Sequence, residues 1–199
     1  MPSHHLITGG QRSGKSRHAE RLGLRWLAQS DAHSVTVLAT AVASDEEMRE
    51  RIARHRADRP DGFETVEAPV HLGAALRAAS APGRLLIVDC LTLWLVNALM
   101  PMHVQEHASS PVSAAAVRAV WSDLRMDFLS ALDEELASPV LLVSNEIGCG
   151  VIPMGAEVRQ FVDELGRLNQ DVAQCCAQLT LMVAGQPFTK AVEKWAGRA

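Results

Sequence analysis

A segment near the start of the chain combines closely spaced glycines with a lysine and two serines. It reads Gly9-Gly10-Gln11-Arg12-Ser13-Gly14-Lys15-Ser16. This is the pattern G-x-x-x-x-G-K-[ST], between an apolar run typical of a strand and a stretch with helical periodicity. Glycines let backbone N–H groups turn inward, and the helix N-terminus adds its positive dipole end, so the segment can hold phosphate groups. Lys15 would reach the β- and γ-phosphates of a nucleoside triphosphate, and the Ser16 hydroxyl would bind Mg²⁺.

The alternative for this segment is an ordinary glycine-rich turn, but the combination of pattern, strand and helix favours a phosphate loop. Such a loop needs an acidic partner at the C-terminal end of a buried strand, and Asp89 directly follows the apolar run Leu85–Val88. Asp89 is therefore a candidate Mg²⁺ ligand, directly or through water. It could instead only cap the next helix. The sequence has no N-K-x-D base-reading motif, which disfavours a regulatory GTPase.

A stretch of acidic and basic residues further on contains one histidine, His55. Ser44 with Glu47 three residues later forms a capping box, which predicts that a helix starts there. Met48, Ile52 and His55 then lie on one face of that helix. We expect this face to pack inward and to bring His55 to the inner edge of the last turn. The pattern alone favours a buried core histidine over a reactive one.

The arginines of this stretch fall into two groups. Arg51 and Arg54 each follow a glutamate by four residues, so ion pairs on the helix surface explain them. Arg56 and Arg59 have no such partner and come where the helix should end. These two are the better candidates for binding phosphate.

Short apolar runs alternate with longer stretches of helical periodicity along the whole chain. The predicted strands are His5–Thr8, Val35–Ala39, Phe63–Glu67, Leu85–Asp89, Val140–Ser144 and Leu179–Ala184. The predicted helices are Lys15–Gln29, Asp45–Ala57, Val70–Ala79, Thr92–Leu99, Val112–Leu136 and Ala156–Ala177. This alternation predicts an α/β fold with a mostly parallel sheet and helices on both faces, in one domain over residues 1–199. Pro101–Pro111, with two prolines and a polar cluster, is predicted to be a surface loop.

Composition limits the classes of partner and compartment. The net charge of −4 over 199 residues gives no bulk attraction for nucleic acid or a membrane surface. No stretch approaches the roughly 20 apolar residues of a membrane helix, and no signal peptide is recognisable. The four cysteines have no C-x-x-C spacing, which indicates reduced thiols in a cytoplasmic protein.

Several longer segments carry a more specific signal than the phosphate loop. They are ITGGQRSGKSRHAERL at 7–22, DEEMRERIARHRADRP at 45–60, LLIVDCLTLWLVN at 85–97, LLVSNEIGCGVIP at 141–153 and FVDELGRLNQDVA at 161–173. With these segments the chain resembles the bifunctional adenosylcobinamide kinase / adenosylcobinamide-phosphate guanylyltransferase family of cobalamin biosynthesis. The resemblance covers most of the chain and implies a RecA-like fold of the P-loop class.

The resemblance also implies two activities. The first phosphorylates the aminopropanol hydroxyl of adenosylcobinamide with ATP or GTP, and the second transfers GMP from GTP to the new phosphate. The second reaction passes through a guanylyl-histidine, and the matching residue is His55, which overrides the core-histidine interpretation. Beyond the phosphate loop, the family pattern assigns nucleotide contacts to Thr40, Ala41, Val42, Arg56, Ala57, Asp58, Arg59, Glu67 and Asp89. It also implies a homotrimer.

Other residues have no firm role at this stage. Asn145 and Glu146 follow a predicted strand and could lie near the corrinoid or the metal, or could only shape a turn. Asn169 lies on a helix where packing or a subunit contact is the favoured interpretation. The H-x-x-E-H spacing from His103 to His107 resembles a zinc motif but falls in the predicted loop, which disfavours zinc. Two competing functions remain: a single-activity small-metabolite kinase and a nucleotide-gated corrinoid-binding protein.

Overall fold

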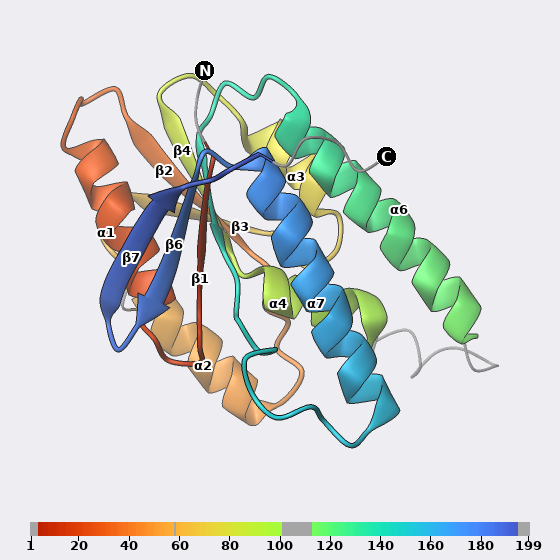
Figure 1. Ribbon diagram of the computed structural model, residues 1–199. Coiled ribbons are helices and arrows are strands. Elements are labelled where there is room, and N and C mark those ends of the chain that lie inside the picture. Colours follow the sequence, from red (N-terminus) through yellow and green to blue (C-terminus); the bar gives the residue numbers. More distant parts are fainter. Residues whose placement is uncertain (1–3, 58, 101–112, 195–199) are drawn as a thin grey trace.

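The strands form one seven-stranded sheet in the computed structural model, which describes residues 4–57, 59–100 and 113–194 (Figure 1). The strands are β1 (His5–Gly9), β2 (Ser34–Ala39), β3 (Phe63–Glu67), β4 (Arg84–Asp89), β5 (Val140–Val143), β6 (Gln178–Val183) and β7 (Gln186–Ala191). Their order across the sheet is β3-β2-β4-β5-β1-β6-β7. The first six strands pair in parallel, and β7 pairs with β6 antiparallel. Because parallel strands share one direction, the carboxyl ends of β1, β4 and β5 open at one edge.

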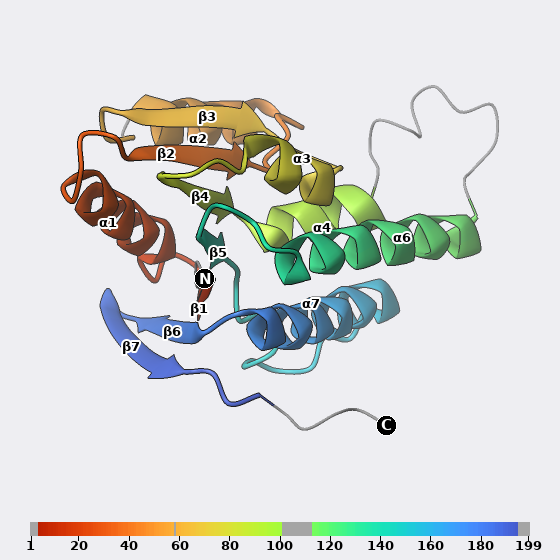
Figure 2. The same cartoon turned by 90° about the horizontal axis from the view of Figure 1, so that it is seen from above.

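Helices cover both faces of the sheet. They are α1 (Lys15–Leu27), α2 (Glu46–Ala57), α3 (Leu72–Ala79), α4 (Leu91–Leu99), α6 (Ala114–Asp133) and α7 (Ala156–Cys175). Figure 2 shows α1 on one face and α3, α4, α6 and α7 on the other. Alternate residues of each buried strand point to opposite faces of the sheet. In β4, Leu86 packs into the larger of two apolar clusters, on the face away from α1, whereas Ile87 packs into the smaller cluster beneath α1. The predicted α/β architecture is confirmed.

The larger apolar cluster contains a group of aromatic side chains. Trp94 of α4 is fully buried, with its ring centroid 5.1 Å from that of Trp121 and 4.9 Å from that of Phe128. Its indole nitrogen donates a hydrogen bond to the carbonyl oxygen of Val70 at 2.7 Å, so the one polar atom of the ring is satisfied. These aromatic contacts fix α4 against α6, and α4 begins directly after the β4 carboxyl end.

All twelve predicted elements are present, with ends shifted by at most a few residues. The predicted cap of α2 is wrong: the Asp45 carboxylate, not Ser44, accepts the Met48 N–H at 2.8 Å, and the helix begins at Glu46. The structure adds β7, a strand that the sequence did not predict. All six β7 residues are exposed, so the strand lacks the apolar pattern by which strands are recognised. The predicted loop Pro101–Pro111, with the H-x-x-E-H spacing, lies outside the described residues.

No helix within the described ranges is long and apolar enough to cross a membrane.

Candidate active site

The loop between β1 and α1 has the backbone conformation that its glycines permit. Gly9 has a φ of +151°, and a Cβ on it would lie 2.5 Å from the carbonyl oxygen of Met182. Gly14, with a φ of +97°, occupies the left-handed region immediately before α1. On its outer side the loop is attached to the β6–β7 turn, where the Gly185 N–H donates to the Ser13 carbonyl oxygen at 3.1 Å. The loop is therefore held against β6 and the β6–β7 turn.

The side chain of Lys15 folds over this loop and is buried. Its ammonium group donates to the carbonyl oxygens of Gly9 at 3.0 Å and of Gly10 at 2.6 Å. Burial lowers the pKa of Lys15, while the negative charges of Asp89 and Glu146 act in the opposite direction. The ammonium group thus lies on the concave side of the loop. A phosphate group bound there could replace the two carbonyl oxygens as its hydrogen-bond acceptor.

Asp89 ends β4 next to the loop, and its position is held by Thr40 at the end of β2. The backbone N–H of Thr40 donates to the Asp89 carbonyl oxygen at 3.2 Å. The Thr40 hydroxyl donates to the Cys90 carbonyl oxygen at 2.7 Å and accepts the Cys90 N–H at 2.8 Å. Asn97 of α4 donates to the Thr40 carbonyl oxygen at 2.7 Å. The fully buried Thr40 side chain therefore braces the backbone around Asp89.

His55 lies on the last turn of α2 and is exposed, which corrects both the core interpretation and the expectation of an inward-packed face. None of the twelve described residues of α2 is buried, and Met48 and Ile52 are only half-buried. The physical reason is that α2 connects β2 to β3, an edge strand that is itself largely exposed, so no second layer covers it.

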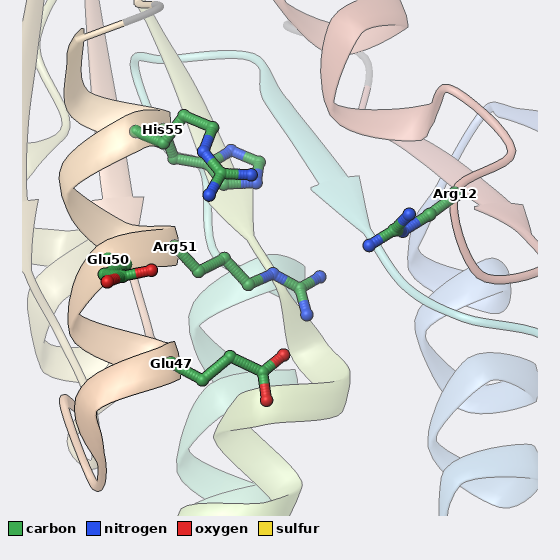
Figure 3. Close-up of a pocket in the computed structure, with 6 residues that line it drawn as sticks. Arg12, Glu47, Glu50, Arg51 and His55 are labelled. Carbon is green, nitrogen blue, oxygen red and sulfur yellow. The ribbon is translucent and has the colours of Figure 1, made fainter.

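An open cleft of about 280 Å³, near the small end of ligand pockets in proteins, lies between α2 and the phosphate loop. The residues that line it are Arg12, Glu47, Glu50, Arg51, Arg54 and His55. Figure 3 shows Arg12 projecting from the phosphate loop toward the face of α2 that carries His55 and Arg51. Its three arginines give the cleft a positive side that suits a polyphosphate. Within α2, an ion pair joins Arg49 to Glu46 on the solvent side.

The basic residues that follow His55 point toward the edge strand and the site. Arg56 forms an ion pair with Glu67 at the end of β3, and Arg59 donates to the Thr65 hydroxyl. Burial lowers the pKa of Arg59, whereas the charges of Asp89 and Glu20 raise it, so Arg59 lies within charge interaction of Asp89. Ala57 is exposed at the helix end, Ala41 and Val42 are half-buried after β2, and Asp58 lies outside the described residues.

The polar segment after β5 contributes residues that the sequence left without a role. The Glu146 N–H donates to the Gly9 carbonyl oxygen at 3.1 Å, which joins this segment to the phosphate loop. The buried Asn169 of α7 donates to the Glu146 carboxylate at 3.3 Å and to the Asn145 carbonyl oxygen at 3.0 Å. Its amide oxygen accepts the Ser144 hydroxyl at 2.6 Å. The sequence signal for these residues was a polar Ser-Asn-Glu run directly after a buried strand. Asp89 likewise directly follows a buried apolar run.

Asp89 and Ser16 are the donors that this site offers to Mg²⁺. Both are half-buried, Asp89 at the end of β4 and Ser16 in the first turn of α1. One carboxylate, one hydroxyl, phosphate oxygens and water form the oxygen set that Mg²⁺ prefers. Within the described ranges no group of three or more histidine, cysteine, aspartate or glutamate side chains could hold a metal by themselves. The donor set therefore fits a cation that arrives with a nucleotide.

The chain is similar to two curated proteins over nearly its whole length and to one solved structure at low sequence identity. A bifunctional adenosylcobalamin biosynthesis protein, CobP, of Pseudomonas aeruginosa is 44% identical over 92% of this chain and 94% of its own length. The protein CobU of Salmonella typhimurium, with the same description, is 36% identical over 90% of this chain and 95% of its own. Among solved structures, the flagellar accessory protein FlaH of Methanocaldococcus jannaschii is 13% identical, with a TM-score of 0.42 over 97% of this chain and 79% of that one. The family model for cobinamide kinase / cobinamide phosphate guanyltransferase matches residues 5–190, and the chain belongs to that family.

Proposed function

We propose that the whole chain acts as one catalytic domain, in which a single nucleotide site serves both reactions of the family. As a member, the chain is a cobinamide kinase and a cobinamide-phosphate guanylyltransferase of adenosylcobalamin biosynthesis. In the first reaction the aminopropanol hydroxyl of adenosylcobinamide takes the γ-phosphate of ATP or GTP. In the second, the new phosphate takes GMP from GTP, which gives adenosyl-GDP-cobinamide and pyrophosphate.

The observation that carries the guanylyl-transfer proposal is that His55 and Arg12 line the same cleft. Arg12 belongs to the phosphate loop, so a triphosphate held by that loop extends into the cleft that His55 faces. A neutral imidazole nitrogen of His55 attacks the α-phosphorus, the bond to the β-phosphate oxygen breaks, and pyrophosphate leaves. The terminal phosphate of cobinamide phosphate then attacks the phosphoramidate and releases His55 unchanged. No proton has to be removed from either nucleophile.

The remaining residues bind and orient the nucleotide in this proposal. Backbone N–H groups of the loop and Lys15 hold the β- and γ-phosphates. Ser16 and Asp89 would hold Mg²⁺, which supplies charge neutralisation on the phosphates when it is bound. The other proposed nucleotide contacts are Gly9, Gly10, Gln11, Ser13, Gly14, Thr40, Ala41, Val42, Arg56, Ala57, Asp58, Arg59 and Glu67. For Thr40, whose hydroxyl is already engaged with Cys90, the contribution is to hold Asp89 in place.

Labelled nucleotides test the guanylyl-histidine. The protein is incubated with GTP labelled with ³²P at the α-position or at the γ-position. We expect acid-labile, alkali-stable protein label from the α-position alone. The His55→Asn variant should lose this label, whereas the matched control His71→Asn, at an exposed histidine before α3, should retain it. Phosphorylated cobinamide without protein labelling would instead indicate a plain kinase, and neither signal would indicate a binding protein.

We also propose that the chain works in the cytosol as a homotrimer, without nucleic-acid or membrane partners. The apolar side chains of Val151, Ile152 and Met154 are 96%, 77% and 96% exposed, and Phe188 of β7 is 62% exposed. Apolar side chains this exposed favour contact with another protein surface or an apolar ligand. Light scattering coupled to gel filtration measures the mass directly, and a monomer mass at micromolar concentration would refute the trimer.

A further inference from the structure

Glu146 follows β5 at the edge of the sheet that also carries the phosphate loop and Asp89. Strand β5 stands between β1 and β4 in the sheet, so the segment after it opens between the phosphate loop and Asp89. The Glu146 N–H and the Lys15 ammonium group donate to the same acceptor, the Gly9 carbonyl oxygen, at 3.1 and 3.0 Å. A residue fixed to that carbonyl stays beside the ammonium group that reaches the terminal phosphates.

The Glu146 carboxylate is both fixed and reachable. Asn169 donates to one of its oxygens at 3.3 Å. The Asn169 amide cannot turn away, because its oxygen accepts the Ser144 hydroxyl and its nitrogen also donates to the Asn145 carbonyl oxygen. The Glu146 residue is only half-buried, so part of the carboxylate remains open to a ligand. A carboxylate held by its surroundings in this way is suited to act on a bound substrate.

The two half-reactions differ in their need for a base. In guanylyl transfer the nucleophiles are an imidazole nitrogen and a phosphate oxygen, and neither loses a proton. In the kinase reaction the nucleophile is an alcohol, whose proton must leave as the new P–O bond forms. A carboxylate beside the γ-phosphate could therefore act as a base in the kinase reaction but has no proton to accept in guanylyl transfer.

We propose that Glu146 is the general base of the kinase reaction, with Asn169 as the residue that positions its carboxylate. The inference rests on the proposed function. The carboxylate takes the proton of the substrate hydroxyl while that oxygen bonds to the γ-phosphorus. The bond between the γ-phosphorus and its bridging oxygen breaks, and a nucleoside diphosphate leaves. Glu146 then returns the proton to water.

The Glu146→Gln variant tests the proposal, because the amide keeps the shape and can still accept the Asn169 hydrogen bond but cannot take a proton. Two rates are measured on each protein: phosphorylation of cobinamide from γ-labelled ATP, and labelling of the protein from α-labelled GTP. We expect kinase turnover to fall by about 100-fold or more. Protein labelling should stay within about threefold of the parent, since no proton moves in that step. The control Glu157→Gln, at an exposed acid in the first turn of α7, should leave both rates unchanged.

Protein labelling also reports that the variant is folded, so a loss of kinase turnover alone cannot come from unfolding. Glu146→Ala with added formate provides a second measurement: a free carboxylate in the vacated position should restore part of the kinase rate. Loss of both rates in Glu146→Gln would overturn the proposal in favour of a structural role, and an unchanged kinase rate would overturn it as well. If the parent protein shows neither rate, the proposed function itself fails.

Discussion

Replacing Thr40 by valine removes one hydroxyl at the carboxyl end of β2 and changes little else in size. That hydroxyl is the partner of both the Cys90 N–H, at 2.8 Å, and the Cys90 carbonyl oxygen, at 2.7 Å. Thr40 is 0% exposed, so water cannot take the place of the hydroxyl without opening the strand ends. The Cys90 carbonyl oxygen keeps the Trp94 N–H at 3.2 Å, but the Cys90 N–H is left without a partner. A backbone group in that state costs on the order of 1–3 kcal/mol, and we therefore expect a loss of about 2 kcal/mol in the free energy of unfolding.

Urea denaturation measures this loss. With a slope of about 3 kcal/mol per molar for a chain of this size, a loss of about 2 kcal/mol should lower the unfolding midpoint by roughly 0.7 M. Thr40→Ser keeps the hydroxyl and removes only a methyl group, so its free energy of unfolding should fall by only about 1 kcal/mol. Thr36→Val is a second control on the same strand, because Thr36 is 1% exposed but makes one longer hydrogen bond, 3.3 Å to Glu64.

The same substitution should affect activity through Asp89. Its carbonyl oxygen accepts the Thr40 N–H at 3.2 Å, and its neighbour Cys90 loses both contacts to the Thr40 hydroxyl. We expect Thr40→Val to lower protein labelling by α-labelled GTP at limiting Mg²⁺ and to recover part of it at high Mg²⁺. If Thr40→Val were as stable and as active as Thr40→Ser, the hydroxyl would not brace this strand end, and the reasoning would be wrong.

Two further predictions concern stability. Burial lowers the pKa of His5 to about 4, so its contribution is fully present above its unfolded pKa of about 6.5 and is lost as the pH falls toward 4. Between pH 7 and pH 5 the free energy of unfolding from urea denaturation should drop by about 1–2 kcal/mol more in the parent than in His5→Gln, because burial also lowers the pKa of His4 and His18 in both proteins. An equal drop in the variant would contradict this. Gly23→Ala should destabilise by about 1–3 kcal/mol, because its Cβ would lie 2.6 Å from the Phe63 ring. Gly166→Ala, with nothing within 4 Å, should stabilise α7 by about 1 kcal/mol, and thermal melts compare the two.

Periodicity predicted the fold well because most elements have one strongly apolar face or lie fully in the core. Leu85–Val88 reads as an unbroken apolar run, and all four residues are buried in β4. The exceptions lie at the edges of the sheet. Strand β7 is fully exposed and has no pattern of alternating burial. The local feature that marks the hairpin is the two-residue turn before β7, where Ala184 and Gly185 both have a positive φ.

The positions of candidate-site residues could be predicted where they depend on the local chain alone. The phosphate loop and Asp89 follow from short motifs at strand ends. The exposure of His55 did not follow, because the spacing of Met48, Ile52 and His55 indicates which residues share a face but not whether a second layer covers that face. The Asn169–Glu146 contact joins residues that are far apart in sequence, and spacing alone could not identify it.

The hydrogen bond from Gly185 to Ser13 spans almost the whole chain. During synthesis the phosphate loop leaves the ribosome early, yet its outer support arrives only with the β6–β7 turn. The nucleotide site therefore matures only after the β6–β7 turn has emerged, and a nascent chain that ends before Gly185 would bind nucleotide weakly even with all eight loop residues in place.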